Sequence, residues 1–115
     1  MNEARPTSRA RTVYVTAADE AQASELAAAL LERRLIACAN LLPGMRSLFR
    51  WQGRVEDQPE AAMLLKTSAD RVDELLAAVD ELHPYDTPCA VVWPIETGLP
   101  AYLAWVQQEV SPDAS

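Results

Sequence analysis

The fold of this chain is decided by residues 45–54, which read Met-Arg-Ser-Leu-Phe-Arg-Trp-Gln-Gly-Arg. Met45, Phe49 and Trp51 alternate with arginine and leucine side chains, which is the two-residue period of a strand with one buried face. The pair Gln52-Gly53 follows, and glycine supplies the positive φ that a tight hairpin connection needs. The stretch therefore predicts the end of one strand, a turn and the start of an antiparallel partner.

Both strands of this predicted hairpin extend well beyond the stretch itself. The first covers residues 37–51 and the second residues 54–67. Pro43 interrupts the first strand, and because proline cannot donate a ladder hydrogen bond, that strand belongs at a sheet edge or carries a bulge. Residues 61–65 read Ala-Ala-Met-Leu-Leu. Such an apolar run is typical of a central strand that is covered on both faces.

A short strand and a helix precede the hairpin. Residues 12–16 are β-branched and aromatic, which favours a first strand. Asp19 then offers a helix N-cap, with Gln22 three residues on as in a capping box, and it opens a predicted helix of about 15 residues. The apolar stripe of this helix consists of Ala23, Leu26, Ala27, Leu30 and Leu31.

A second helix, a fourth strand and a last helix follow the hairpin. Ser68 can cap the second helix, and Pro84 ends it, because proline disfavours a helical conformation in the residue before it. Residues 90–95 predict the fourth strand, and Pro100 opens a short last helix at its first turn. The helical stripes consist of Val72, Leu75, Leu76, Val79 and Leu82, and then of Leu103, Val106 and Val110.

The predicted order is β-α-β-β-α-β with one extra C-terminal helix. Two right-handed crossovers joined by a hairpin give a four-stranded antiparallel sheet with both long helices on one face, the ferredoxin-like arrangement of the α+β class. A chain of 115 residues suits one such domain, which we expect to span residues 11–110. Residues 1–10 and 111–115 are polar, and we expect them to be disordered tails.

In this arrangement the long strand over residues 37–51 lies at a sheet edge. Natural sheets usually blunt or cover an apolar edge, because it invites association with another chain. We therefore predict a homo-oligomer in which a partner covers Met45, Leu48, Phe49 and Trp51. The alternative is that the last helix folds over the strand within one chain.

Composition limits the classes of function. A net charge of −7 and a pI of about 4.6 argue against nucleic acid as the partner, because nucleic-acid binders gather Lys and Arg on a basic face. No apolar run approaches the roughly 20 residues that span a bilayer, and residues 1–6 lack the apolar stretch of a secretory signal, so we expect a cytoplasmic protein. Cys38 and Cys89 form no CxxC motif, and we expect both to be reduced and buried.

His83 is the only histidine, and it lies in the segment Leu-His-Pro-Tyr-Asp-Thr-Pro at 82–88. In a structural role, a cationic side chain at a helix end meets the unpaired carbonyls and the negative end of the helix dipole. In a functional role, the imidazole faces a cleft as a ligand or anion contact, and Asp86 and Cys89 could complete a metal site. No GxSxG, HExxH, P-loop or GxGxxG motif occurs, so we predict no catalytic residue and no enzymatic activity.

A series of short stretches covers nearly the whole chain from about residue 12 to 110. They are RLIACAN at 34–40, PG at 43–44, WQGRVE at 51–56, LKT at 65–67, HPYDTP at 83–88, PI at 94–95 and AYLAW at 101–105. Together they resemble the CutA family of divalent-cation-tolerance proteins. The resemblance implies a compact homotrimer built through long strands, related in architecture to PII-type signalling proteins. It also implies a non-enzymatic role in tolerance of copper and other divalent metals.

The resemblance also implies which residues could hold a metal. Some bacterial members are credited with a copper site formed by a Cys in the first strand and a His-His pair before Pro-Tyr. Here Val15 stands at the first position and Leu82 replaces the first histidine, which leaves His83 as the candidate ligand for copper or another divalent cation. One imidazole lacks the further ligands that select copper, so we expect weak binding and no required cofactor.

In a trimer, side chains from neighbouring subunits could meet in an intersubunit cleft. Trp51, Lys66, His83 and Tyr85 form the predicted cleft, although Trp51 suits packing across an interface better than binding a ligand. PII-type relatives place small effectors between subunits. By that analogy, the alternative function is a sensor that binds a small anion or a nucleotide there.

Overall fold

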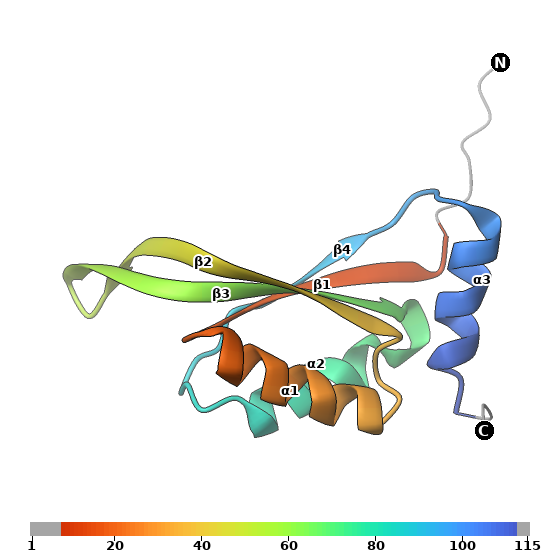
Figure 1. Ribbon diagram of the computed structural model, residues 1–115, viewed down its shortest axis with the longest axis horizontal. Helices are drawn as coiled ribbons and strands as arrows, with labels where there is room; N and C mark the ends of the chain where they lie inside the picture. Colours follow the sequence, from red (N-terminus) through yellow and green to blue (C-terminus); the bar gives the residue numbers. More distant parts are fainter. Residues whose placement is uncertain (1–7, 113–115) are drawn as a thin grey trace, which may run out of the picture.

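The computed structural model describes residues 8–112. Four antiparallel strands form one sheet in the order β2-β3-β1-β4, with α1 and α2 against one face (Figure 1). The predicted ferredoxin-like α+β fold with an extra C-terminal helix is confirmed. The elements are β1 (Ala10–Ala17), α1 (Glu20–Glu32), β2 (Cys38–Trp51), β3 (Arg54–Ser68), a 3-10 turn (Ala69–Arg71), α2 (Val72–Leu82), β4 (Ala90–Pro94) and α3 (Pro100–Glu109).

Residues 8–10, which we assigned to the N-terminal tail, make contacts with the sheet. Residues 1–7 and 113–115 of the predicted tails lie outside the described residues. Ala10, however, already pairs with Ser68 in the sheet, and the Ser8 hydroxyl donates to the carbonyl of Ile95. Neither Ser8 nor Ala10 favours a strand by itself. Pairing with β3 therefore extends β1 beyond the β-branched run that strand propensity detects.

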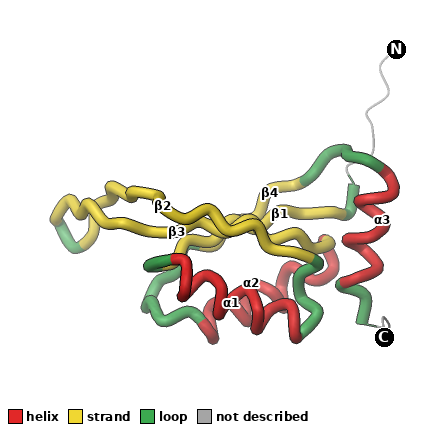
Figure 2. Tube along the Cα trace, in the orientation of Figure 1, coloured by secondary structure: helices red, strands yellow, loops and turns green. Residues whose placement is uncertain are grey.

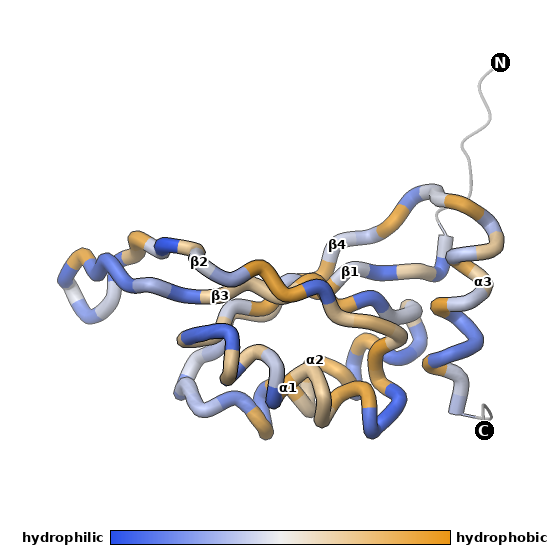
Figure 3. Tube along the Cα trace, viewed as in Figure 1, coloured by the Kyte–Doolittle hydropathy of each residue, from blue (hydrophilic) through white to orange (hydrophobic). Residues whose placement is uncertain are grey.

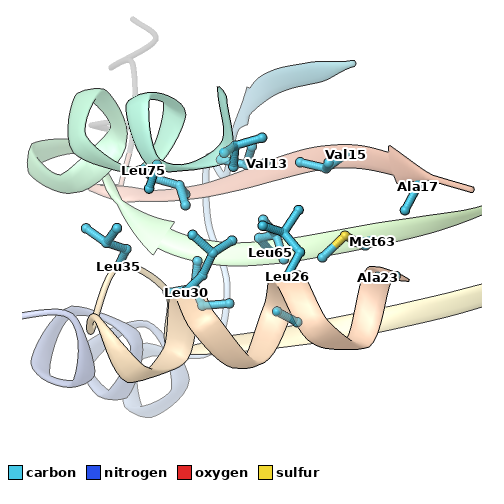
Figure 4. Close-up of a cluster of buried hydrophobic side chains, with 14 of the residues drawn as sticks. Val13, Val15, Ala17, Ala23, Leu26, Leu30, Leu35, Met63, Leu65 and Leu75 are labelled. Carbon is cyan, nitrogen blue, oxygen red and sulfur yellow. The ribbon is translucent and has the colours of Figure 1, made fainter. Parts of the chain in front are cut away.

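The core lies between the two helices and the face of the sheet that they cover (Figure 4). Val13 and Val15 of β1 and Met63 and Leu65 of β3 are fully buried there against Leu30 of α1. Because successive strand residues point to opposite faces, the even-numbered residues of β1 and β3 project from the other side of the sheet. We call that side the open face, since α1 and α2 both lie opposite to it (Figure 1).

The first helix begins where its cap predicts. Asp19 accepts a hydrogen bond from the Gln22 amide at 2.8 Å, and the Gln22 side chain accepts one from the Ala18 amide at 2.9 Å. The helix ends after 13 residues. Leu31, which we assigned to the buried stripe, is 44% exposed, because one residue beyond buried Leu30 turns the side chain about 100° around the helix.

Ser68 caps the short 3-10 turn instead of α2 itself. Its hydroxyl hydrogen-bonds the Asp70 carboxylate at 2.5 Å and makes no backbone capping bond. The α-helix then starts at Val72 and ends at Leu82, as the position of Pro84 predicts. The first turn of the predicted second helix is therefore wound more tightly than the sequence pattern indicated.

The β2–β3 hairpin forms a long two-stranded arm. Trp51 pairs with Arg54 across a turn in which Gln52 and Gly53 both have positive φ, 51° and 78°. Two positive φ angles make the type I′ turn that suits the twist of a hairpin. Strand β1 pairs with β3 only as far as Ala61, so residues 45–60 project beyond the rest of the sheet (Figure 2). We call these residues the hairpin arm.

A bulge marks the base of the hairpin arm, as Pro43 predicted for an edge strand. Leu42 pairs with Ala62, but the next pair joins Met45 to Glu60, so between these two pairs β2 contains one residue more than β3. Gly44 adopts a φ of 76° there. Beyond the bulge, Met45 and the odd-numbered residues of β2 project from the open face, opposite the even-numbered residues of β3.

The last helix does not cover the hairpin arm. α3 stands at the other end of the sheet, where it buries Val106 and Val110 (Figure 1). The alternative of an intrachain cover is therefore wrong, because α3 lies too far along the sheet. Leu48 and Trp51 remain 63% and 46% exposed, and Figure 3 shows hydrophobic residues distributed along the arm.

Both cysteines are free thiols, but the expectation that both are buried is wrong. Cys89 is exposed and Cys38 is half-buried. Cys89 immediately precedes β4, whose residues Ala90 and Val92 pack on the core, and the alternation of a strand turns Cys89 away from it. An apolar sequence context therefore does not imply a buried thiol where only one face of a sheet is covered.

Candidate functional site

His83 occupies the junction between α2 and the loop that leads to β4. It ends the helix with an extended backbone, φ −75° and ψ 136°, as the residue before a proline should. Its side chain is only 6% exposed. The ring Nε2 lies 2.8 Å from the carbonyl oxygen of Thr16 at the end of β1, and the amide of Tyr85 donates to Nδ1 at 3.2 Å.

These two partners fix the state of the imidazole. A carbonyl oxygen only accepts, so Nε2 carries the hydrogen, and Nδ1 accepts from the Tyr85 amide, so the ring is neutral. The expectation of a cationic side chain facing the carbonyls of its own helix is wrong, because the ring reaches across to Thr16 of β1 instead. His83 thus joins the second crossover to the end of the first strand.

Tyr85 lies directly over His83. The two ring centroids are 4.6 Å apart at an interplanar angle of 58°, and the Tyr85 hydroxyl donates to Glu60 at 3.2 Å. Burial raises the pKa of Tyr85, and the nearby charge of Glu60 raises it further. The loop after α2 therefore presents a phenol to the carboxylate at the base of the hairpin arm.

A second tyrosine borders the same carboxylate from the sheet. Tyr14 projects from the open face of β1, its ring stacks on Trp93 at 5.4 Å, and its hydroxyl lies 3.5 Å from the sulfur of Met45. Burial raises the pKa of Tyr14, and the neighbouring Cys89 and Glu60 raise it further. Glu60 therefore acts electrostatically on both tyrosines.

These residues form the wall of a groove of about 930 Å³ on the open face. The groove lies between the sheet, the hairpin arm and the loop before β4. Its lining includes three carboxylates, Glu56, Glu60 and Asp86, and one arginine, Arg46. The remaining lining residues are Tyr14, Thr16, Met45, Ser47, Leu48, Phe49, Trp51, Gln58, Tyr85, Thr87 and Cys89.

The arginine of the groove is already neutralised. Arg46 makes a two-pronged ion pair with Asp57 across the arm, at 2.7 Å and 2.6 Å. The hydrogen bond from Arg46 lowers the pKa of the Asp57 carboxyl. The groove therefore combines aromatic walls with an excess of negative charge.

The predicted cleft residues are only partly brought together in one chain. Trp51 and Tyr85 line the groove, and His83 lies buried beside Tyr85. Lys66 lies elsewhere: its ammonium donates to Asn40 at 3.2 Å, near the opposite end of β3. Since a strand rises about 3.3 Å per residue, roughly 40 Å separates Lys66 from the tip of the arm. Convergence with Lys66 would need a second subunit and stays a prediction.

The sequence pattern did not reveal Tyr14 or Glu60 as groove residues. The odd-numbered residues of β1 form the core, so the even position of Tyr14 was the available sign that its side chain projects from the opposite face. The position of Glu60 depends on the bulge in the facing strand, which shifts Met45 opposite to it. A bulge is not visible in a hydropathy period, and the pairing became clear only with the fold.

The donor set around His83 does not fit a metal centre within one chain. Both ring nitrogens already have hydrogen-bond partners, and residues 8–112 contain no group of three or more His, Cys, Asp or Glu placed to hold an ion. Asp86 and Cys89 line the groove, whereas His83 lies behind Tyr85. A metal-ligating His83 stays a prediction, and it requires the ring to release at least one bond.

A smaller polar contact joins α3 to the start of β2. The Cys38 sulfur lies 3.5 Å from the Tyr102 hydroxyl. This contact, together with burial, raises the pKa of Tyr102 to about 12. The phenol therefore holds its proton more tightly than a free tyrosine and helps to fix α3 against the sheet.

Comparison with known proteins places this chain and its fold in one family. Residues 11–109 match the family described as "CutA1 divalent ion tolerance protein". The chain belongs to the CutA1 family. A CutA1 relative, the divalent-cation tolerance protein CutA of Pectobacterium atrosepticum, is 45% identical over 102 residues, which cover 89% of this chain and 93% of the relative.

Solved CutA1 structures share the fold. CutA from Xylella fastidiosa has a TM-score of 0.88 at 36% identity, over 90% of this chain and 100% of that one. The Archaeoglobus fulgidus protein, described as a periplasmic divalent cation tolerance protein, has a TM-score of 0.85 at 37% identity, over 89% and 99%. In the described part of the present chain, no helix has the length and apolar character needed to cross a membrane.

Proposed function

We propose that this CutA1 chain acts in divalent-metal tolerance as a non-enzymatic cytoplasmic homotrimer. Membership of the divalent ion tolerance family over residues 11–109 is the observation that supports the proposal most strongly. The metal is copper or another divalent cation, bound weakly and not as a required cofactor. Neither nucleic acid nor membrane is a partner in this proposal.

The exposed hairpin arm supports the homotrimer. The sheet order leaves β2 and β4 as its two edges, and these edges are unlike each other. Joining one edge to the other in the next copy is a head-to-tail contact, which closes into a ring where the rotation allows. Such a ring would cover the predicted interface residues, Met45, Leu48, Phe49 and Trp51, together with exposed Trp93.

The buried surroundings of the candidate metal positions support weak binding. Val15 is fully buried on the core side of β1, and Leu82 packs against the core from the end of α2. Neither side chain can coordinate a metal, and His83 already has a partner at each nitrogen. Tight binding of copper needs several soft or imidazole ligands, and residues 8–112 bring no such group together.

The PII-like alternative has less support. A small anion or a nucleotide needs a free cation or a cluster of backbone amides in its site. In the groove, the lining cation Arg46 is already held by Asp57, and Glu56, Glu60 and Asp86 would repel an anion. The observed charges therefore favour a cationic occupant over an anionic one.

Calorimetric titration with Cu(II) and Zn(II) tests the metal proposal directly. We expect weak binding that falls at least about tenfold in His83→Ala, with Glu81→Gln as the control because Glu81 is an exposed carboxylate on the helical layer. Equal affinities in the wild type and His83→Ala would exclude His83 as the ligand. A strain that lacks the gene and tolerates copper and zinc as well as its parent would overturn the tolerance role.

A further inference from the structure

The hairpin arm has a row of hydrogen-bond acceptors on the side that lines the groove. Glu56, Gln58 and Glu60 are alternate residues of β3, so their side chains project from one face of the strand, and all three line the groove. Because a strand rises about 3.3 Å per residue, roughly 13 Å separates the backbones of Glu56 and Glu60. The row therefore has a carboxylate at each end and an amide between them.

A second row, on β2, faces these acceptors across the hairpin. It consists of a thioether, a hydroxyl and a phenyl ring, which line the groove as well. Because the bulge at Gly44 sets the register, each of these side chains lies opposite one acceptor of β3. The two rows form a strip that is acidic along one side and mostly apolar along the other. The facing pairs are Met45 with Glu60, Ser47 with Gln58 and Phe49 with Glu56.

No cation of the described chain neutralises the two carboxylates of this strip. Glu60 accepts from the Tyr85 hydroxyl at 3.2 Å, and Glu56 accepts from the amide of Gln58 at 3.4 Å. Neither carboxylate takes part in an ion pair within residues 8–112, and Arg46 of the groove lining is held in an ion pair of its own. Neutral donors orient a carboxylate but leave its charge, so both ends of the strip attract a cation.

The spacing of the carboxylates favours a long cation over a compact one. Within residues 8–112, no three His, Cys, Asp or Glu side chains are placed to hold one ion between them. A compact ion would therefore leave Glu56 or Glu60 without a partner. An extended chain with nine bonds between its terminal nitrogens spans about 11 Å, since three backbone bonds span at most about 3.6 Å. The remaining difference is within the reach of the two glutamate side chains.

We propose that the groove binds a linear aliphatic polyamine along this strip. The ammonium groups at its two ends meet Glu56 and Glu60, and a central ammonium lies beside Gln58. The methylene segments lie along Phe49 and Met45. This inference goes beyond the proposed metal tolerance and does not rest on it. The proposed ring would place the next copy over part of the strip, so binding is measured on the assembled protein.

The side chains along the strip suit each part of such a ligand. Gln58 donates to Glu56 through its NH₂ group, so its amide oxygen can accept from the central ammonium. Phe49 and Tyr85 are exposed, and the faces of aromatic rings attract ammonium cations. Bonds between an ammonium and a carboxylate are stronger than neutral ones, so Glu56 and Glu60 determine the position of the ligand.

Calorimetric titration of the full chain with spermidine, which has nine bonds between its terminal nitrogens, tests the proposal. We expect Glu56→Gln and Glu60→Gln each to weaken the affinity at least about tenfold, the loss that follows removal of one charged hydrogen-bonding group. Glutamine keeps the side-chain length and still accepts from the neighbouring donors, so both variants should fold. Glu81→Gln is the matched control, because it removes one exposed carboxylate from the helical layer, and it should keep the wild-type affinity.

Two diamines of equal charge separate a spanning ligand from general attraction to an acidic protein. Octane-1,8-diamine has nine bonds between its nitrogens, whereas butane-1,4-diamine has five and spans only about 6 Å. The longer diamine should lose affinity in both Glu56→Gln and Glu60→Gln. The shorter diamine cannot reach both carboxylates, so it should lose affinity in no more than one of these variants.

The remaining outcomes are decisive in the other direction. Wild-type protein that takes up no spermidine would overturn the inference, and so would an equal loss of affinity in Glu81→Gln and the groove variants. A loss that occurs only together with a change in molar mass, measured by light scattering, would assign the effect to assembly and overturn it too. Protein that binds spermidine but neither Cu(II) nor Zn(II) would support this inference and overturn the metal proposal alone.

Discussion

Replacing His83 should remove two hydrogen bonds that hold the loop after α2. In His83→Ala, the carbonyl of Thr16 loses its side-chain donor and the amide of Tyr85 loses its acceptor. A buried polar group left without a partner costs about 1–3 kcal/mol, and the lost contact with the Tyr85 ring adds about 0.5–1.5 kcal/mol. We expect His83→Ala to lower the free energy of unfolding by about 3–5 kcal/mol.

Two further substitutions divide that loss between the bonds. Glutamine can place an amide donor where Nε2–H lies, so His83→Gln should keep the bond to Thr16. Asparagine can place an oxygen near Nδ1, so His83→Asn should keep the bond to the Tyr85 amide. Each should recover about 1 kcal/mol relative to alanine, the typical net value of one hydrogen bond.

Urea unfolding followed by circular dichroism measures these differences. All variants must be compared at one protein concentration, because association with other copies adds to apparent stability. Equal unfolding midpoints for wild type and His83→Ala would refute a structural role for the imidazole. Equal losses in all three variants would show that ring packing dominates and that neither bond matters separately.

Three further changes test other parts of the molecule. Trp51→Ala should leave the isolated chain intact but weaken association by about 2–4 kcal/mol, as for an interface hot spot; an unchanged dissociation curve would show that Trp51 stays outside the interface. Because Cys38 raises the pKa of Tyr102, the stabilising effect of that phenol is present below pH 10 and is lost as pH rises through about 12. In a variant whose other tyrosines are replaced by phenylalanine, absorbance at 295 nm follows the ionisation of Tyr102, and Cys38→Ala should move its pKa toward 10. An unmoved titration curve would contradict the contact. Arg34 has a positive φ of 57° and donates to the last turn of α3. Arg34→Ala should lower the free energy of unfolding by about 1–2 kcal/mol, and Arg34→Gly should lower it less, since glycine relieves the backbone strain. Equal thermal midpoints in the two variants would show that there is no strain.

The strand and helix pattern was predictable because one face of each element is buried. The apolar stripe of α1 and the alternation in the hairpin both follow from a single covered side of the sheet. Pro43 located the edge strand and its bulge, since a missing amide has few tolerated places in a sheet. The hairpin turn likewise followed from Gly53.

The site was harder to predict, because it depends on contacts between distant segments. The sequence singled out His83 and Tyr85 but could not show that the imidazole bonds to Thr16 of β1. It also could not show that Tyr85 meets Glu60, since that contact depends on where the arm leaves the sheet. The burial of Cys89 was mispredicted for a related reason: sequence does not say which face of a strand is covered.

The bulge at Pro43-Gly44 determines which residues of the hairpin arm share the open face, so an odd change in the number of β2 residues there would reverse the two sides of the strand. Upstream of the bulge the even-numbered residues of β2 share the open face, and downstream the odd-numbered ones do. Removing one residue there would turn Phe49 and Trp51 to the opposite side of the arm, although the core would be untouched. Adding two residues to each strand would lengthen the arm and leave Phe49 and Trp51 on the same side. Related chains can therefore vary their reach in steps of whole pairs, while the aromatic side stays fixed.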